Sequence, residues 1–110
     1  MTCDVFTIKR GDRLPTLRYT LIGPDGSAQD LTGATVVFSM AEKTVGTLVV
    51  NRGASTIVTA ASGIVDYAWG ALDTATAGEY NGEFEATIGG LKMSFPNDGN
   101  LTISIVSDLG

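Results

Sequence analysis

Residues 73–88 constrain the fold more than any other part of this sequence. A polar turn leads into a strictly alternating run, in which Tyr80, Phe84 and Ile88 share one side and polar residues occupy the other. A side-chain period of two is that of a β-strand with one buried face. A tyrosine at the start of such a strand needs a hydrogen bond for its hydroxyl once the ring is buried. The sequence therefore predicts a strand whose first tyrosine fastens the turn before it.

A tyrosine in this position is typical of the corner that locks immunoglobulin-like β-sandwiches. We assign Asp73, Gly78 and Tyr80 to this structural corner. Other segments carry strand patterns separated by turn residues: 5–10, 17–21, 36–40, a hairpin of 47–50 with 55–60 around residues 51–53, 63–69, 91–95 and 101–105. The sequence predicts an all-β fold, an immunoglobulin-like antiparallel β-sandwich of about seven to nine short strands. The one helical candidate is a single turn near residues 71–75.

Three aromatic residues are expected to anchor the core. Phe38 and Phe84 lie on the apolar side of their alternating runs, and Trp69 ends a run that carries Val65 and Tyr67 on the same side. The alternative for Trp69 is an exposed platform that stacks on a sugar ring. Such sites usually combine several exposed aromatic residues, so burial in the core is favoured.

Length and charge limit the classes of function. A chain of 110 residues suits one domain, so residues 1–110 are taken as one sandwich. The net charge is −5 with seven basic residues, which argues against nucleic acid as a partner, because phosphate binding needs a concentrated basic face. Lys9, Arg10 and Arg13 form the one local basic cluster, for which a solvated strand end is favoured over a contact within the protein or with a partner.

The sequence contains few candidate residues for catalysis or metal binding. The chain has no histidine and a single cysteine, Cys3, which excludes Ser-His-Asp and Cys-His nucleophiles, most zinc sites and an internal disulfide. Glu79, Glu83 and Glu85 share one outward strand face, where a solvated surface is favoured over a glycosidase pair. The aspartates fit turns and lack calcium-loop spacing: Asp25, Asp30, Asp66, Asp73 and Asp98. We expect no enzyme activity, no catalytic residues, no metal and no cofactor.

The sequence also lacks an apolar run of about 18 residues, and its N-terminus is polar. We therefore expect no membrane partner and no secretory signal.

An ordered series of motifs resembles a known family, the immunoglobulin-like N-terminal domain of upper baseplate proteins from tailed bacteriophages and related small virion proteins. The motifs span nearly the whole chain: Gly11-Asp12, Pro15, Leu17, Leu21, Asp25-Gly26, residues 30–36, Phe38, Met40, residues 63–67, Trp69, residues 73–80, residues 83–85, residues 95–99 and residues 101–103. The family proteins continue into a segment that holds receptor-binding trimers, whereas this sequence ends at Gly110, so that holding role is not carried over.

What the resemblance implies is a non-catalytic structural protein of a phage virion, made in the host cytoplasm. It would be a tail or baseplate accessory or adaptor that attaches proteins to one another, in many copies per particle. Capsid decoration is the first alternative, and a carbohydrate- or host-receptor-binding module is an alternative of another class.

Unpaired sandwich edges are the expected places for partner contact, since their backbone groups pair readily with a neighbouring strand. The segments expected to touch other virion proteins are 5–10 and 47–60, through Val5, Ile8, Arg10 and Val49.

Overall fold

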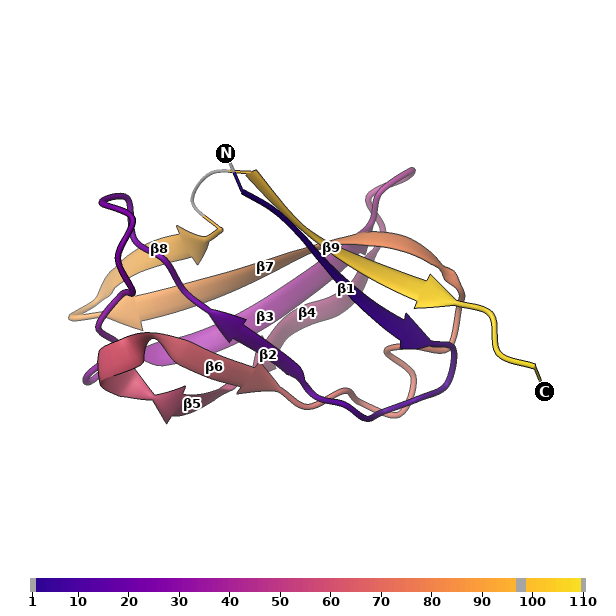
Figure 1. The fold of residues 1–110 in the computed structure, drawn as a ribbon, viewed down its shortest axis with the longest axis horizontal. Helices are drawn as coiled ribbons and strands as arrows, with labels where there is room; N and C mark the ends of the chain where they lie inside the picture. Colours follow the sequence, from indigo (N-terminus) through magenta and orange to yellow (C-terminus); the bar gives the residue numbers. More distant parts are fainter. Residues whose placement is uncertain (1, 97–98, 110) are drawn as a thin grey trace.

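The computed structural model describes residues 2–96 and 99–109. These residues form nine β-strands and one 3₁₀ turn. The strands are β1 (Thr2–Lys9), β2 (Leu17–Thr20), β3 (Thr35–Glu42), β4 (Leu48–Ala54), β5 (Thr56–Thr59), β6 (Ile64–Tyr67), β7 (Gly78–Ile88), β8 (Leu91–Phe95) and β9 (Gly99–Val106), and the turn η1 spans Ala60–Ser62. In Figure 1, β2, β6 and β5 lie together along the lower side of the molecule, with the other strands above them.

The larger sheet is organised around β7, its longest strand. One edge of β7 pairs with β3 along its length, whereas the other edge pairs first with β9 and then with β8. The strand order is β1-β9-β7-β3-β4, with β8 beside the C-terminal half of β7. The second sheet has the order β2-β6-β5.

This order defines the fold as an immunoglobulin-like sandwich, as the sequence predicts. The run β9-β7-β3-β4 corresponds to the GFCC′ strands of a variable-type domain, and β2-β6-β5 corresponds to three strands of the ABED sheet. The strand that would complete that second sheet is β1, which instead pairs with β9 in the larger sheet.

The pairing of β1 with β9 departs from the predicted antiparallel arrangement, because these two strands are parallel. All the other strand pairs are antiparallel. A hairpin forces antiparallel pairing, but β1 and β9 come from opposite ends of the chain and no short turn joins them.

The predicted hairpin of 47–50 with 55–60 is wrong. Residues 51–53 do not turn the chain; they continue β4, where Gly53 pairs with Phe38 of β3. β5 pairs with β6 in the other sheet, so the chain crosses between the sheets at Ser55, whose N–H donates to the carbonyl oxygen of Val36. The hairpin that β4 does form is with β3, through residues 43–47.

The core follows the alternation read from the sequence. In β7, Tyr80, Phe84 and Ala86 are buried, whereas Asn81 and Glu83 are exposed. Buried residues of the other strands, together with Leu21 just after β2 and Trp69 just after β6, pack against them: Leu17, Val36, Phe38, Met40, Val65, Tyr67, Leu101, Ile103 and Ile105. The burial predicted for Phe38, Phe84 and Trp69 is therefore confirmed.

Two predicted turns are confirmed. The N–H of Gly26 donates to the carbonyl oxygen of Gly23 at 3.0 Å, and the linker of β7 and β8 is the pair Gly89 and Gly90, both with positive φ. The helical turn lies at η1 rather than at residues 71–75, which form hydrogen-bonded turns. The side chain of Cys3 and the turn residues Asn97 and Asp98 lie outside the described residues.

Candidate interaction surface

The predicted tyrosine corner is present. The hydroxyl of Tyr80 donates to the main-chain oxygen of Thr76 at 2.6 Å, and burial raises the pKa of this phenol, with nearby Glu42 adding to the rise. Gly78 begins β7 with φ 155°, where an added Cβ would lie 3.6 Å from the ring of Tyr80. The corner therefore fixes how the chain enters β7.

Asp73, the third predicted corner residue, makes its hydrogen bonds at the start of the same loop, whereas Tyr80 bonds its end. Its Oδ2 accepts from the hydroxyl of Tyr67 at 2.5 Å and from the N–H of Gly70 at 2.7 Å. The Tyr67 pKa is raised, first by burial and then by this hydrogen bond. Asp73 thus ties the end of β6 to the start of the loop, while Tyr80 ties the end of the loop to β7.

A second loop is bonded to this one. The N–H of Gly11 donates to the carbonyl oxygen of Thr74 at 2.9 Å, and the Thr74 hydroxyl donates to the carbonyl oxygen of Asp12 at 2.8 Å. Arg13 Nε donates to the carbonyl oxygen of Trp69 at 2.9 Å. Loops 10–16 and 68–77 therefore form one rigid platform. In Figure 1 they lie at the right, at the same end as the β3–β4 hairpin and the C-terminus.

The side chain of Trp69 connects this platform to the core of the sandwich. Its ring is 1% exposed, it packs edge-on against Phe38 and Tyr67, and its Nε1 donates to the carbonyl oxygen of Pro15 at 3.1 Å. A ring that is covered in this way cannot serve as a sugar-stacking surface, so the alternative for Trp69 is excluded.

Two leucines stand exposed on the platform. Leu14 is 75% exposed and Leu72 is 79% exposed, one on each of the bonded loops. Sequence reasoning missed both, since neither belongs to an alternating run. It also missed Thr74, whose buried hydroxyl joins the loops although a threonine in a polar turn carries no pattern that distinguishes it.

Only some of the predicted contact residues are exposed in the structure. Val5 is exposed on β1, and Arg10 is exposed and pairs with Asp108 at 2.8 Å. Ile8 is a correction: it is buried in the core, because alternation along β1 places it on the opposite face from Val5. Val49 is half-buried and packs against the core at an irregularity in β4, so it offers little surface to a partner.

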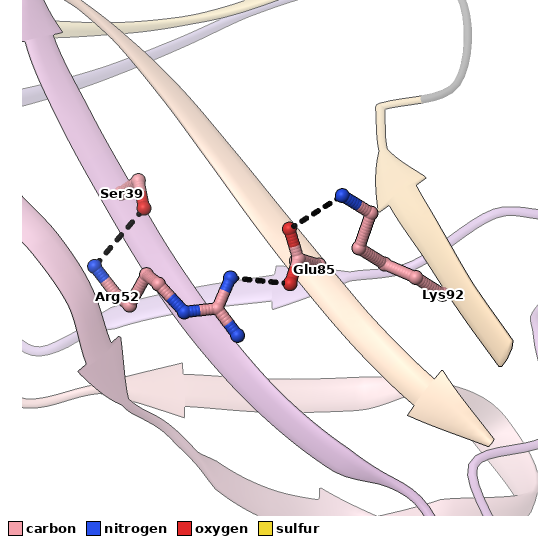
Figure 2. Close-up of polar contacts among 4 residues, drawn as sticks. All are labelled: Ser39, Arg52, Glu85 and Lys92. Atoms are coloured by element: carbon pink, nitrogen blue, oxygen red, sulfur yellow. Dashed lines mark hydrogen bonds and ion pairs between the residues drawn. The ribbon is translucent and has the colours of Figure 1, made fainter. Parts of the chain in front are cut away.

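The outward glutamates divide into two kinds. Glu79 and Glu83 are exposed, as expected for a solvated face. Glu85 is largely covered, since Arg52 Nη1 lies 2.6 Å and Lys92 Nζ lies 3.6 Å from its carboxylate oxygens (Figure 2). The Arg52 guanidinium lowers the pKa of Glu85, with Lys92 adding to the effect. A carboxylate held ionised between two cations is unsuited to donating a proton as a general acid.

Arg52 reaches Glu85 because the backbone of β4 bulges. Residues 51 and 52 oppose the single residue Ser39, whose hydroxyl oxygen accepts from the N–H of Arg52 at 3.1 Å. Arg52 has φ 56°, a left-handed conformation that is uncommon for a residue other than glycine. Figure 2 shows its side chain lying across β3 toward β7.

The predicted turn aspartates mostly hold turns. Asp25 accepts from the N–H of Ser27 at 3.1 Å, and this bond lowers the pKa of Asp25. Asp30 accepts from the hydroxyl of Thr32 at 2.7 Å and from the N–H of Thr32 at 3.0 Å, and these bonds lower the pKa of Asp30. Asp66 instead pairs with Arg18 through two hydrogen bonds. Within residues 2–96 and 99–109, no three His, Cys, Asp or Glu side chains gather closely enough to hold a metal ion.

No protein-family model matches this sequence, and a search of curated proteins gives no match. The described segments include no helix with the length and apolarity needed to cross a membrane.

Proposed function

We propose that this protein is a non-catalytic structural component of a tailed-bacteriophage virion, an adaptor of the tail or baseplate that attaches one protein to another. The observation that carries the proposal is the platform of loops 10–16 and 68–77, whose hydrogen bonds hold together the two loops that carry the exposed Leu14 and Leu72. A rigid loop that already holds its apolar residues outward loses little conformational entropy when a partner covers them.

The resemblance to phage baseplate domains supports the choice of partner class, namely other virion proteins. The polar side chains support a structural role, since Asp66, Asp73 and Glu85 are all engaged in bonds that hold the fold. A buried Trp69 removes the aromatic surface on which the carbohydrate-binding alternative depended.

The test is the position of the chain in purified phage particles. Mass spectrometry of the particles and gold-labelled antibodies viewed by electron microscopy would locate it. Label at the tail end is expected. Label spread over the capsid shell would replace the adaptor role by capsid decoration, and absence from purified particles would overturn both.

Two matched variants would link that position to the platform. Leu14→Ser with Leu72→Ser should reduce incorporation into particles at unchanged melting temperature. Leu91→Ser removes a similarly exposed leucine from the opposite end of the sandwich and should leave incorporation unchanged. Equal incorporation of all three proteins would show that the platform is not the docking surface.

A further inference from the structure

The sandwich is open along one side, where the outer edges of β1 and β2 face each other. On the opposite side the chain itself joins the sheets, because β4 runs into β5 through Ser55. Among the described residues, no strand pairs with the second edge of β1 or of β2. An open groove of about 440 Å³ lies between these edges. One hydrogen bond spans it, from the Tyr19 hydroxyl to Asp4 Oδ2 at 2.6 Å.

The edge of β2 presents a regular series of backbone groups to this groove. The N–H of Leu21 donates to the carbonyl oxygen of Gly63 on the β6 side. In an antiparallel ladder the residues alternate, so Arg18 and Thr20 direct their N–H and C=O groups away from β6. Ile22 does the same, since its bridge to Ala28 continues the ladder on the β6 side.

Apolar side chains make up about half of the groove lining, and both charged residues in it already have partners. Phe6, Leu17 and Ile22 line it, and Ile22 is 43% exposed. The two charged residues in the lining already have partners, because Asp4 accepts from Tyr19 and Arg18 pairs with Asp66. A side chain that enters the groove should therefore be uncharged, since a charge there would lose hydration and gain no partner.

Other strand edges of the molecule are protected. β4 and β5 carry register shifts, and β8 carries Lys92. Bulges and edge lysines are the usual devices that prevent a further strand from pairing. β1 and β2 pair with their neighbours without a register shift, and both border the groove. Lys9 lies at the end of β1 outside the groove lining, and Arg18 of β2 is paired with Asp66.

We propose that this groove takes an extended segment of a partner protein, which adds to the edge of β2 as a fourth strand and places uncharged apolar side chains against Phe6 and Ile22. The segment would occupy the position that the first strand of an ABED sheet fills in constant-type immunoglobulin domains. Backbone pairing supplies the affinity, and the apolar lining selects the side chains.

This inference rests on the proposed attachment role and names the chemistry of the partner. The probe is a capped peptide of alternating threonine and valine about seven residues long, enough to cover the edge from Arg18 to Ile22 at about 3.3 Å per residue. It is titrated at millimolar concentration into ¹⁵N-labelled protein and followed by NMR. The amides of Arg18, Thr20 and Ile22 should shift, and their hydrogen exchange should slow by about tenfold or more at saturation.

Two control peptides test the chemistry on the unaltered protein. Methylation of alternate peptide nitrogens removes the backbone donors and should abolish the shifts. Replacement of the valines by lysines should weaken binding strongly. Shifts that survive N-methylation, that appear along β4 or β5 instead, or that never appear would each overturn the proposal.

Two protein variants locate the site. Thr20→Pro removes an N–H that β6 does not use and should abolish peptide binding. Val58→Pro alters the residue skipped by the register shift in β5, at the far edge of the same sheet, and should leave binding intact. If Thr20→Pro fails to fold, the N-methylated peptide still decides. If the protein binds the peptide but is absent from virions, only the proposed function is contradicted. If the protein is present in virions but does not bind the peptide, only this inference is contradicted.

Discussion

The hydroxyl of Tyr80 donates a hydrogen bond to the main-chain oxygen of Thr76, four residues earlier, at 2.6 Å. Tyr80 is 3% exposed, so this bond is made where water has little access. Tyr80 also lies on the central strand β7, opposite Glu42 of β3 and Ile103 of β9. One side chain thereby connects the loop between the two sheets to the middle of the larger sheet.

Replacing Tyr80 by phenylalanine should lower the free energy of unfolding by about 1–3 kcal/mol, because the ring stays packed while the carbonyl of Thr76 loses its donor. Chemical denaturation monitored by tryptophan fluorescence would measure the change. Thr76→Ala is the matched control, since it keeps the carbonyl, and its effect should stay within about 0.5 kcal/mol. Equal losses in the two variants would mean that the hydroxyl contributes nothing specific.

Much of this arrangement can be predicted from the sequence. Alternation fixes which residues of β7 face inward, because a one-residue slip would expose every apolar side chain of the strand. The corner is predictable because a buried phenol needs a local acceptor. Both features depend on residues close together in the chain.

What sequence reasoning could not give depends on distant pairs. Residues 51–53 have the composition of a turn, yet they form a bulge because Ser39 accepts from the N–H of Arg52. Nothing local shows that Thr74 joins Asp12 across 62 residues of sequence. The groove likewise arises only because β1 leaves β2 and pairs with β9.

Gly82 leaves space for an aromatic ring in the core. A Cβ at this position would lie 3.0 Å from Phe38 Cε1 and 3.3 Å from Leu101 Cδ2. Gly82→Ala should therefore destabilise the protein by about 1–3 kcal/mol through overpacking. The neighbouring exposed change Asn81→Ala should cost less than about 0.5 kcal/mol in the same denaturation assay.

A double variant tests this cause. If the methyl group collides with the ring, Phe38→Leu should cost less in the Gly82→Ala background than in the unaltered protein. Purely additive effects would show that the two positions do not interact.

Arg52 combines an unfavourable backbone conformation with a favourable ion pair. Its left-handed φ of 56° costs about 1–2 kcal/mol for a residue with a Cβ, whereas its pair with Glu85, in which the Arg52 side chain is exposed, contributes about 0–1 kcal/mol. Arg52→Gly should therefore be about 1 kcal/mol more stable than Arg52→Ala, because both lose the ion pair and only glycine relieves the backbone. In denaturation experiments, the difference between the two variants measures the backbone cost, and the salt dependence of the unaltered protein measures the ion pair. If alanine proves as stable as glycine, the bulge holds no backbone strain.

The raised pKa values of two tyrosines predict that the free energy of unfolding decreases at alkaline pH. Burial, followed by hydrogen bonds to Asp4 and Asp73, raises the pKa values of Tyr19 and Tyr67 above their ordinary value of 10.0. Above that pH the unfolded chain releases protons that the folded chain retains, so the contribution is complete below about pH 10 and is lost as the pH rises further. Each tyrosine adds at most about 1.4 kcal/mol per pH unit to the slope.

Urea denaturation between about pH 9 and about pH 11, at constant ionic strength, would measure this slope. The double change Tyr19→Phe with Tyr67→Phe removes both hydroxyls and keeps both rings. Its overall stability should fall, but its decline with pH should be shallower than that of the unaltered protein. Parallel declines in the two proteins would assign the alkaline loss to other groups.

Trp69 is the residue on which the platform and the core both depend. Trp69→Ala should cost about 3–5 kcal/mol, because it leaves a cavity between Phe38 and Tyr67 and removes the donor to the Pro15 carbonyl. Leu72→Ala on the same loop is the control and should change stability by less than about 0.5 kcal/mol, since that side chain is exposed.

Hydrogen exchange separates the role of Trp69 in the core from its role in supporting the platform. If Trp69 supports the platform, the amide of Gly11, which donates to Thr74, should lose protection in Trp69→Ala by a larger factor than the amides of β7. Uniform loss of protection across these amides would show that Trp69 stabilises the sandwich as a whole and gives the loops no particular support.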